Sequence, residues 1–280
     1  MMWAFLLLAL AGIAVLGVLA WRYVQLLDSD RKLAIIDTIN GIFMRAEARG
    51  VFPAVPGFER AYLKSYPRLR ILEDNYSIIR EECEKLLGVK EKMTDMETLG
   101  GSYTEGGIHT AKWKTFMFKS GKFIEENCRL APRTAGLLRH IPNLYTAFFS
   151  VLEPHQHIAP HFGYYKGFLR YHLGVIIPRD NADGSCYLRI NANPADNALR
   201  DRNLIDKGEY YYWRNAEGVM FDDTFLHDAC NNSDEVRVVL WLDIARKLPW
   251  HLHLFNLLVL FIAHKEESVK EARRRGTLDR

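Results

Sequence analysis

Between residues 112 and 244, apolar residues gather in seven short segments. These segments are rich in β-branched and aromatic residues and are bounded by Gly, Pro, Asn or Asp, which predicts β-strands. One helix, expected at 131–142, interrupts them. Many short strands with few helices favour a mainly β fold, a sandwich or barrel of jelly-roll type. The predicted strands are 112–118, 144–152, 168–177, 186–191, 209–214, 218–223 and 236–244.

Helical spacing replaces this pattern nearer the N-terminus. Apolar residues of 66–88 recur with a helical period, and Gly88 is a plausible end for that helix. Leu33, Ile36, Ile39 and Phe43 also recur at helical spacing. That second helix either packs on the domain or lies along a membrane surface. The glycine-rich, polar stretch 93–112 predicts a loop.

The first 21 residues carry no charged side chain. A run of about 20 apolar residues is long enough to cross a bilayer, so a transmembrane anchor is predicted at 1–21. A cleaved signal peptide is the alternative, but no Lys or Arg precedes Arg22. Several basic residues follow the segment, and the positive-inside rule then predicts that the rest of the chain lies in the cytoplasm. These residues are Arg22, Arg31, Lys32, Arg45 and Arg49.

A second strongly apolar segment, 254–264, is too short to span a membrane comfortably. It predicts either a buried helix or a segment that enters the bilayer interface. The chain is therefore divided into an anchor (1–21), a helical juxtamembrane and pre-catalytic region (22–90), a β domain (91–247), and an apolar helix with a polar tail (248–280).

Charge and cysteine content exclude some classes of protein. The net charge is +3, and no basic block lies among aromatic residues, so nucleic-acid binding is not expected. The four cysteines form no CxxC pair, which argues against a zinc finger or a thioredoxin-type site. We expect them to be free thiols.

Polar side chains interrupt two of the predicted strands. Arg170 and His172 share one face of the strand over 168–177, because side chains alternate between faces with a period of two. Arg237 opens the strand over 236–244. Buried charges are costly without partners, so an anionic ligand inside the jelly roll is expected, and a guanidinium fork matches a carboxylate. The nearby His161 suggests a two-histidine iron site, yet Gly163 stands where such sites commonly carry Asp.

Several spaced elements resemble the aspartyl/asparaginyl β-hydroxylase family, which are iron(II)- and 2-oxoglutarate-dependent dioxygenases on a double-stranded β-helix. The resemblance covers residues 113–243. It rests first on "PHFG" with His161, an Arg nine residues later (Arg170) and a second His two residues further on (His172), together with a Ser eleven residues before His161 (Ser150). It rests also on "FDDTFLH", which ends at His227 and is followed ten residues later by Arg237. The stretch "WKTF", which begins at Trp113, is the last matched element.

The resemblance implies a role for each matched residue. His161 and His227 would bind iron, and Arg237 would hold the far carboxylate of 2-oxoglutarate. O2 would be the second cosubstrate, and the reaction would hydroxylate an unactivated carbon. Further residues would line the cosubstrate pocket, namely Trp113, Ser150, Arg170 and His172.

The family lacks the carboxylate ligand, so water would fill the position that Gly163 leaves open. A halide there, or Asp222 or Asp223 as a ligand, are the alternatives. His155 and His157 are expected to be solvated loop residues.

Two branches of the family suit a membrane anchor. One hydroxylates Asp or Asn in proteins, and the other comprises bacterial lipid A hydroxylases. The apolar terminal segments favour a lipid substrate by a narrow margin. Gly163 and the long segment 191–213 argue against the branch of lipid A hydroxylases. The bilayer and a lipid or peptide substrate are the expected partners. A membrane-anchored pseudoenzyme that binds a ligand without turnover is the third hypothesis.

Overall fold

The structure is a computed structural model that describes residues 22–99 and 111–278. The predicted anchor at 1–21 and the glycine-rich part of the predicted loop lie outside the described residues. Within those two described ranges, no helix is both long enough and apolar enough to cross a membrane.

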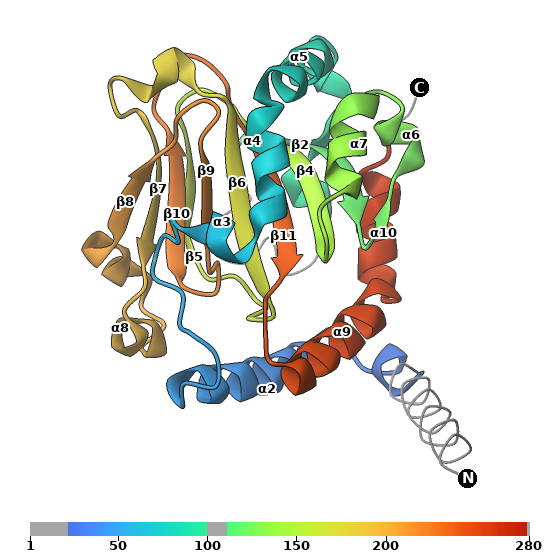
Figure 1. The fold of residues 1–280 in the computed structure, drawn as a ribbon, viewed down its shortest axis with the longest axis vertical. Helices are drawn as coiled ribbons and strands as arrows, with labels where there is room; N and C mark the ends of the chain where they lie inside the picture. The colour runs from blue at the N-terminus through green and yellow to red at the C-terminus, as the bar shows by residue number, and fades with distance from the viewer. Residues whose placement is uncertain (1–21, 100–110, 279–280) are drawn as a thin grey trace.

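Two antiparallel sheets form the centre of the molecule (Figure 1). The larger sheet has the order β1-β2-β4-β11-β6-β9, with β3 paired to β2, and the smaller sheet has the order β5-β10-β7-β8. This arrangement confirms a mainly β fold. The strands of the larger sheet are β1 (Thr94–Asp95), β2 (Trp113–Ser120), β3 (Lys122–Phe123), β4 (Leu144–Leu152), β6 (Phe168–Ile176), β9 (Gly218–Phe221) and β11 (Arg237–Ala245). Those of the smaller sheet are β5 (Gln156–His161), β7 (Cys186–Asn191), β8 (Glu209–Tyr212) and β10 (Leu226–Asn231).

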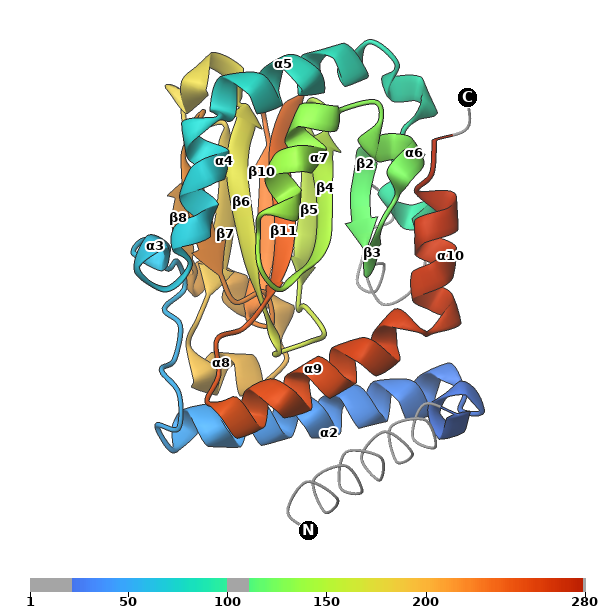
Figure 2. The same ribbon diagram turned by 45° about the vertical axis from the view of Figure 1, so that its right-hand side comes forward.

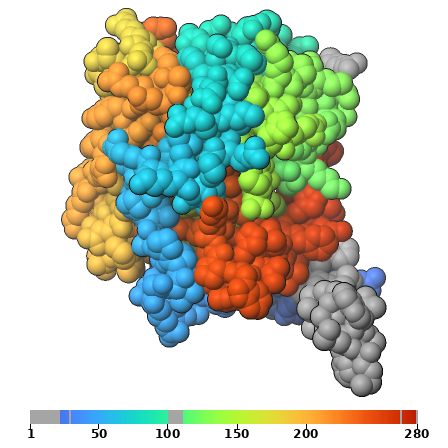
Figure 3. Space-filling model, viewed as in Figure 1, coloured from blue at the N-terminus to red at the C-terminus, as the bar shows by residue number. Residues whose placement is uncertain are grey.

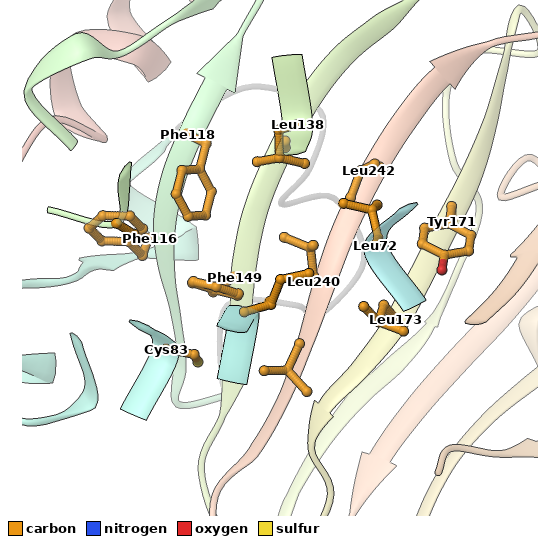
Figure 4. Packing of buried hydrophobic residues seen from close by; sticks show 14 of the residues in the cluster. Leu72, Cys83, Phe116, Phe118, Leu138, Phe149, Tyr171, Leu173, Leu240 and Leu242 are labelled. Atoms are coloured by element: carbon orange, nitrogen blue, oxygen red, sulfur yellow. The ribbon is translucent and has the colours of Figure 1, made fainter. Parts of the chain in front are cut away.

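The outer face of the larger sheet carries the main hydrophobic core. Tyr171 and Leu173 of β6 lie on this face beside Leu240 and Leu242 of β11, packed against helices (Figure 4). The alternation predicted for β6 is therefore confirmed. The covering helices include α4 (Arg70–Asp74), α5 (Tyr76–Leu87) and α7 (Pro132–Arg139).

The inner face of the larger sheet packs against the smaller sheet. Val239 and Trp241 of β11 meet Leu188 and Ile190 of β7 in a second apolar cluster. The same strands also place polar side chains between the sheets, including Arg170, which is buried. The space between the two sheets thus combines apolar packing with buried polar groups.

Two long helices lie side by side below the sheets (Figures 1 and 2). They are α2 (Ser29–Ala48) and α9 (Trp250–His264), and Phe43 and Phe255 join them with ring centroids 5.9 Å apart. The chain then turns into α10 (Glu267–Arg275), which lies against β2. The shorter elements are α3 (Tyr62–Ser65), η1 (Pro67–Leu69), η2 (Lys90–Lys92), η3 (Met96–Leu99), α6 (Glu125–Cys128), η6 (Pro178–Asn181), α8 (Pro194–Ala198) and η7 (Arg202–Lys207).

Some predicted boundaries are wrong. The helix expected over 66–88 is broken at Asn75 into α4 and α5, and a 3-10 turn precedes it. The predicted loop 93–112 contains β1 and η3 in its described part. The stretch after His227, which no predicted strand covered, continues as β10. The sequence patterns also failed to indicate β5, although β5 and β10 carry the two expected iron ligands.

Candidate functional site

A cavity between the two sheets brings all seven predicted site residues together. Its wall is formed by side chains of β2, β4, β5, β6, β10 and β11, with further residues from β7 and β9 and from the residue that follows β8. The predicted residues in this wall are Trp113, Ser150, His161, Arg170, His172, His227 and Arg237. The remaining lining residues are Ile158, Leu188, Trp213, Phe221, Ala229 and Trp241.

His161 and His227 face each other across neighbouring strands. They are register partners of β5 and β10, and their ring centroids lie 4.1 Å apart. His161 lies three positions after Ile158, whereas their partners His227 and Ala229 are only two positions apart. The extra residue in β5 is a bulge. A bulge changes the direction of the side chains that follow it. It therefore turns His161 to the same side as Ile158, into the cavity.

Each imidazole presents one nitrogen to the cavity. The Nδ1 atoms of His161 and His227 lie 2.8 Å from the carbonyl oxygens of Ala159 and Phe225. A carbonyl only accepts, so each Nδ1 carries the proton and each Nε2 keeps a free lone pair. A hydrogen bond of this kind fixes the ring orientation that a metal requires.

Burial keeps both rings neutral. It lowers the pKa of His161 to about 4, and it lowers the pKa of His227 well below the usual value, with a further contribution from His161. Only the neutral imidazole has a lone pair for a metal. The two rings are therefore ready to act as ligands at neutral pH.

Gly163 makes room for a carboxylate from the turn between β9 and β10. A Cβ atom at Gly163 would lie 2.2 Å from Oδ2 of Asp223, and the Gly163 amide donates to the Asp223 carbonyl at 2.7 Å. Oδ2 of Asp223 in turn pairs with Arg170 at 2.8 Å. Asp222 pairs instead with Lys166 at 2.7 Å. In the described part of the chain, neither aspartate completes a three-residue metal cluster with the histidines.

Arg237 is buried, and the part of the chain that the structure describes supplies no counter-ion for it. Its side chain is 1% exposed, and among the described residues no carboxylate pairs with it and its Nε has no hydrogen-bond partner. The guanidinium carbon lies 4.5 Å from the ring centre of Trp213. Burial lowers the pKa of Arg237 to about 10, so the group stays charged at neutral pH. An unpaired buried cation is costly, and an anionic ligand would remove that cost.

Other donors line the same cavity. Both ring nitrogens of His172 and Nε1 of Trp213 are buried without a partner among the described residues. Nε1 of Trp113 donates to Oγ of Ser150 at 2.8 Å. Burial, with Arg170 and Arg237 nearby, lowers the pKa of His172 well below its usual value. The cavity therefore collects polar groups that its own residues leave partly unsatisfied.

Arg170 differs from Arg237 in its surroundings. Its guanidinium lies between Asp223 at 2.8 Å and Asp243 at 2.9 Å, and over the ring of Trp241 at 3.8 Å. Burial raises the pKa of Asp223 to about 6, against the opposing effect of Arg170. Arg170 borders the cavity as predicted, but two carboxylates of the chain already neutralise it.

The sequence patterns did not single out all of the site. Trp213, Phe221 and Trp241 supply its aromatic walls, and Asp223 and Asp243 fix Arg170. For Asp243 a signal existed, because its side chain shares a strand face with Arg237 and Trp241. Trp213 follows β8 of the other sheet, and no local pattern links it to the site.

His155 and His157 stay outside the cavity wall. The side chain of His155 is 64% exposed and pairs with Asp234, while that of His157 is 46% exposed and pairs with the buried Asp228. Both are exposed, as expected of solvated residues, but His157 lies in β5 and not in a loop.

Comparison with known proteins agrees with this geometry. The chain is 30% identical over 244 residues to an ornithine lipid ester-linked acyl 2-hydroxylase from Rhizobium tropici, covering 86% of this chain and 80% of that protein. It is 26% identical over 192 residues to the human aspartyl/asparaginyl β-hydroxylase, covering 66% of this chain but 21% of that protein.

Solved structures with a similar arrangement include a prolyl 4-hydroxylase from Pseudomonas putida. That structure has a TM-score of 0.38 and 11% identity, and it covers 61% of this chain and 88% of that chain. The model of the family described as aspartyl/asparaginyl β-hydroxylase matches residues 73–247, which include every residue of the cavity wall. The chain belongs to the aspartyl/asparaginyl β-hydroxylase family.

Proposed function

We propose that this chain is an iron(II)- and 2-oxoglutarate-dependent hydroxylase that acts on an acyl chain of a membrane lipid. The observation that carries the proposal is that one cavity holds two neutral imidazoles and a buried guanidinium that has no counter-ion among the described residues. We further propose that residues 1–21 anchor the chain in a membrane, with the catalytic domain on the cytoplasmic side.

The two histidines fit an iron(II) ion. Imidazole nitrogen suits this metal, and the Nε2 atoms of His161 and His227 both remain available. A non-haem oxygenase also needs open coordination positions for a chelating keto acid and O2. A site with two protein ligands leaves such positions, and Gly163 adds no side chain there.

The rest of the cavity fits a dicarboxylate. Arg237 would hold the carboxylate far from the metal through two parallel hydrogen bonds. The unsatisfied nitrogens of His172 and Trp213 would find acceptors on the same molecule. The chemistry expected with metal and cosubstrate bound is oxidative decarboxylation of 2-oxoglutarate to succinate and CO2, coupled to transfer of one oxygen atom from O2 to a C–H bond.

The protein's own contribution is to position the groups and exclude water. Trp113, Trp213 and Trp241 wall the cavity, so little solvent shares it with the reacting atoms. The Trp113–Ser150 hydrogen bond fixes one side of the wall at 2.8 Å. Arg170 is immobilised by Asp223 and Asp243, which holds the end of β6 beside His161.

A lipid substrate is supported by the relative from Rhizobium tropici, which is named for hydroxylation of a lipid acyl chain and matches 86% of this chain. Hydroxylation of Asp or Asn in proteins is the second candidate, and it is supported by the human relative. The human protein is much longer, so the part it shares with this chain supports the reaction better than the substrate.

Turnover by the reconstituted full-length protein tests the proposal. We expect succinate to form only with iron(II), 2-oxoglutarate and O2, and a lipid species in the same vesicles to gain one oxygen atom. The His161→Ala variant should lose both products. Arg139→Met, which removes an exposed ion pair between Arg139 of α7 and Glu125 of α6, is the matched control and should keep both. Succinate without an oxidised lipid would favour the peptide alternative, and neither product would favour a pseudoenzyme.

A further inference from the structure

One face of α9 is apolar, exposed and uncovered by the described residues. Trp250 is 76% exposed, Leu254 is 58% exposed and Phe261 is 51% exposed, and Leu257 and Leu258 are each 38% exposed. These five residues recur at helical spacing, so they form one continuous stripe. We call this stripe the docking face. The C-terminal helices reach the molecular surface in Figure 3.

The opposite face of α9 is mostly apolar as well, with the buried Asn256 among its apolar residues. Leu252, Phe255, Val259 and Leu260 pack into the cluster that joins α9 to α2 and the end of the β domain. No Asp, Glu, Lys or Arg lies between Trp250 and His264. A helix that is hydrophobic all round belongs in a protein core or in contact with lipid, and the described protein covers only half of this one.

We propose that the docking face rests on the surface of a lipid bilayer and holds the iron-binding end of the β domain there. The ends of α9 fit that position, because Trp250 is at one end and Lys265 at the other, with its ammonium 5.0 Å from the ring centre of Phe261. Interfacial aromatic residues and basic side chains that reach toward the headgroups are typical of helices lying in a membrane surface. At about 1.5 Å per residue, the 15 residues of α9 are too short to span the hydrocarbon core.

The position of the chain before α2 also points to a bilayer. The uncharged run of residues 1–21 ends at Arg22, directly before the described structure. Gln25 and Lys32 then bind Glu266, at 2.5 and 2.7 Å, so this part of the chain is fixed beside the C-terminal end of α9. An apolar run that enters a membrane at this point would bring α9 to the membrane surface.

The two helices hold the loop that follows the iron ligand His161. Asn40 of α2 donates to the carbonyl of Tyr164 at 2.7 Å and accepts from the amide of Lys166 at 2.9 Å. Asn256 of α9 accepts from the Tyr165 hydroxyl at 2.5 Å and donates to the carbonyl of Gly167 at 2.9 Å. Both asparagines thus bind one loop between β5 and β6. Docking of α9 would therefore set the height of the iron site above the bilayer.

The contact with lipid can be measured without any turnover. The four native cysteines are free but buried, so a spin label would react with a newly introduced cysteine. Single labels would be placed by Leu254→Cys, Leu258→Cys and Phe261→Cys in the full-length protein, reconstituted in nanodiscs of phosphatidylethanolamine and phosphatidylglycerol. Matched controls are Val89→Cys and Leu130→Cys, which replace exposed apolar residues on other parts of the surface.

The accessibility of each label to O2 and to a water-soluble nickel chelate distinguishes the occupants of the docking face. We expect the three α9 labels to be relaxed more by O2 than by the chelate, and the two control labels to show the reverse. Equal exposure of all five labels to the chelate would overturn the proposal. Labels shielded from both reagents would mean that residues 1–21 cover α9. Dipolar broadening between labels would mean that a second copy of the chain covers α9. Either result would also overturn the proposal. Because iron and 2-oxoglutarate are not needed, the outcome is independent of the proposed reaction.

Discussion

Two buried arginines flank β11, and their surroundings differ completely. Arg246 follows the strand and binds Asp222, Glu47 and the carbonyls of Lys166 and Phe168. Arg237 begins the strand and has no carboxylate partner among the described residues. A buried charge is normally paired, because removing it from water without compensation costs several kcal/mol. The paired arginine therefore holds the fold together, whereas the unpaired one marks a place for a ligand.

The pairing around Arg246 joins parts that are distant in sequence. Asp222 directly follows β9, Lys166 lies in the loop after His161, and Glu47 belongs to α2. Burial alone would raise the pKa of Asp222, but Arg246 and Lys166 hold it at about 2. This network and the apolar cluster between α2 and α9 together fix the end of the β domain that carries His161.

The largest effect is expected from breaking the paired site. Asp222→Asn leaves two buried cations with only Glu47 to compensate them. Removing one partner of a buried ion pair typically costs about 3–5 kcal/mol. Urea unfolding followed by tryptophan fluorescence would measure this loss. An unfolding midpoint equal to that of the unchanged protein would contradict the structural role of the network.

Arg237→Met should change the free energy of unfolding of the ligand-free protein in the opposite direction. The substitution removes an unpaired buried charge and keeps an apolar side chain of similar length, so the free energy of unfolding should stay the same or rise by about 1 kcal/mol or more. Arg246→Met is the matched variant and should destabilise the fold. If both variants destabilise it equally, Arg237 has an internal partner and the contrast between the two sites fails.

Gly163 offers a test of the packing beside His161. A methyl group there would collide with the carboxylate and carbonyl of Asp223, so Gly163→Ala should destabilise the protein by about 1–3 kcal/mol. Gly136→Ala is the control, because no heavy atom lies within 4 Å of its added Cβ and helix α7 favours alanine. Thermal unfolding of both variants would check this, and a neutral Gly163→Ala would contradict the close contact.

The buried histidines predict a pH dependence for the metal-free protein. His161, His172 and His227 have pKa values lowered by burial, so the unfolded state binds more protons below about pH 6.5. The three neutral imidazoles therefore do not reduce the free energy of unfolding above about pH 6.5, but that free energy decreases as the pH falls below this value toward their lowered pKa values. Each contributes a slope of up to about 1.4 kcal/mol per pH unit. His172→Phe should reduce the slope between pH 6 and pH 5, and an unchanged slope would contradict the placement of this residue.

Apolar patterning predicted the strands whose side chains pack. The limits of β4 and β7 agree with the predicted 144–152 and 186–191, because apolar and aromatic residues dominate both. The strands β5 and β10 escaped notice because their sequences, QHIAPH and LHDACN, are polar. Those polar residues are the candidate ligands and their neighbours. Because they replace apolar residues, the two strands lack the apolar pattern by which a strand is recognised in a sequence.

The spacing of motifs predicted which residues meet, but not how they are held. His161, His227 and Arg237 were each indicated by sequence and do line one cavity. The bulge that turns His161 inward leaves no local signal. The partners of Arg170 come from the chain after β9 and from β11, 53 and 73 residues away in sequence. Such contacts follow from tertiary structure, and a single sequence does not show them.

The central claim is that Arg237 and the two histidines together bind a keto acid on iron. Anaerobic titration of the full-length protein with iron(II) and then 2-oxoglutarate, followed by visible absorbance, tests it most directly. We predict a charge-transfer band that saturates with 2-oxoglutarate and that is absent in His161→Ala. In Arg237→Met, half-saturation should require at least about 30-fold more 2-oxoglutarate, because losing one partner of a buried charge pair costs about 2 kcal/mol or more. No band in the unchanged protein, or equal affinity in Arg237→Met, would contradict the claim.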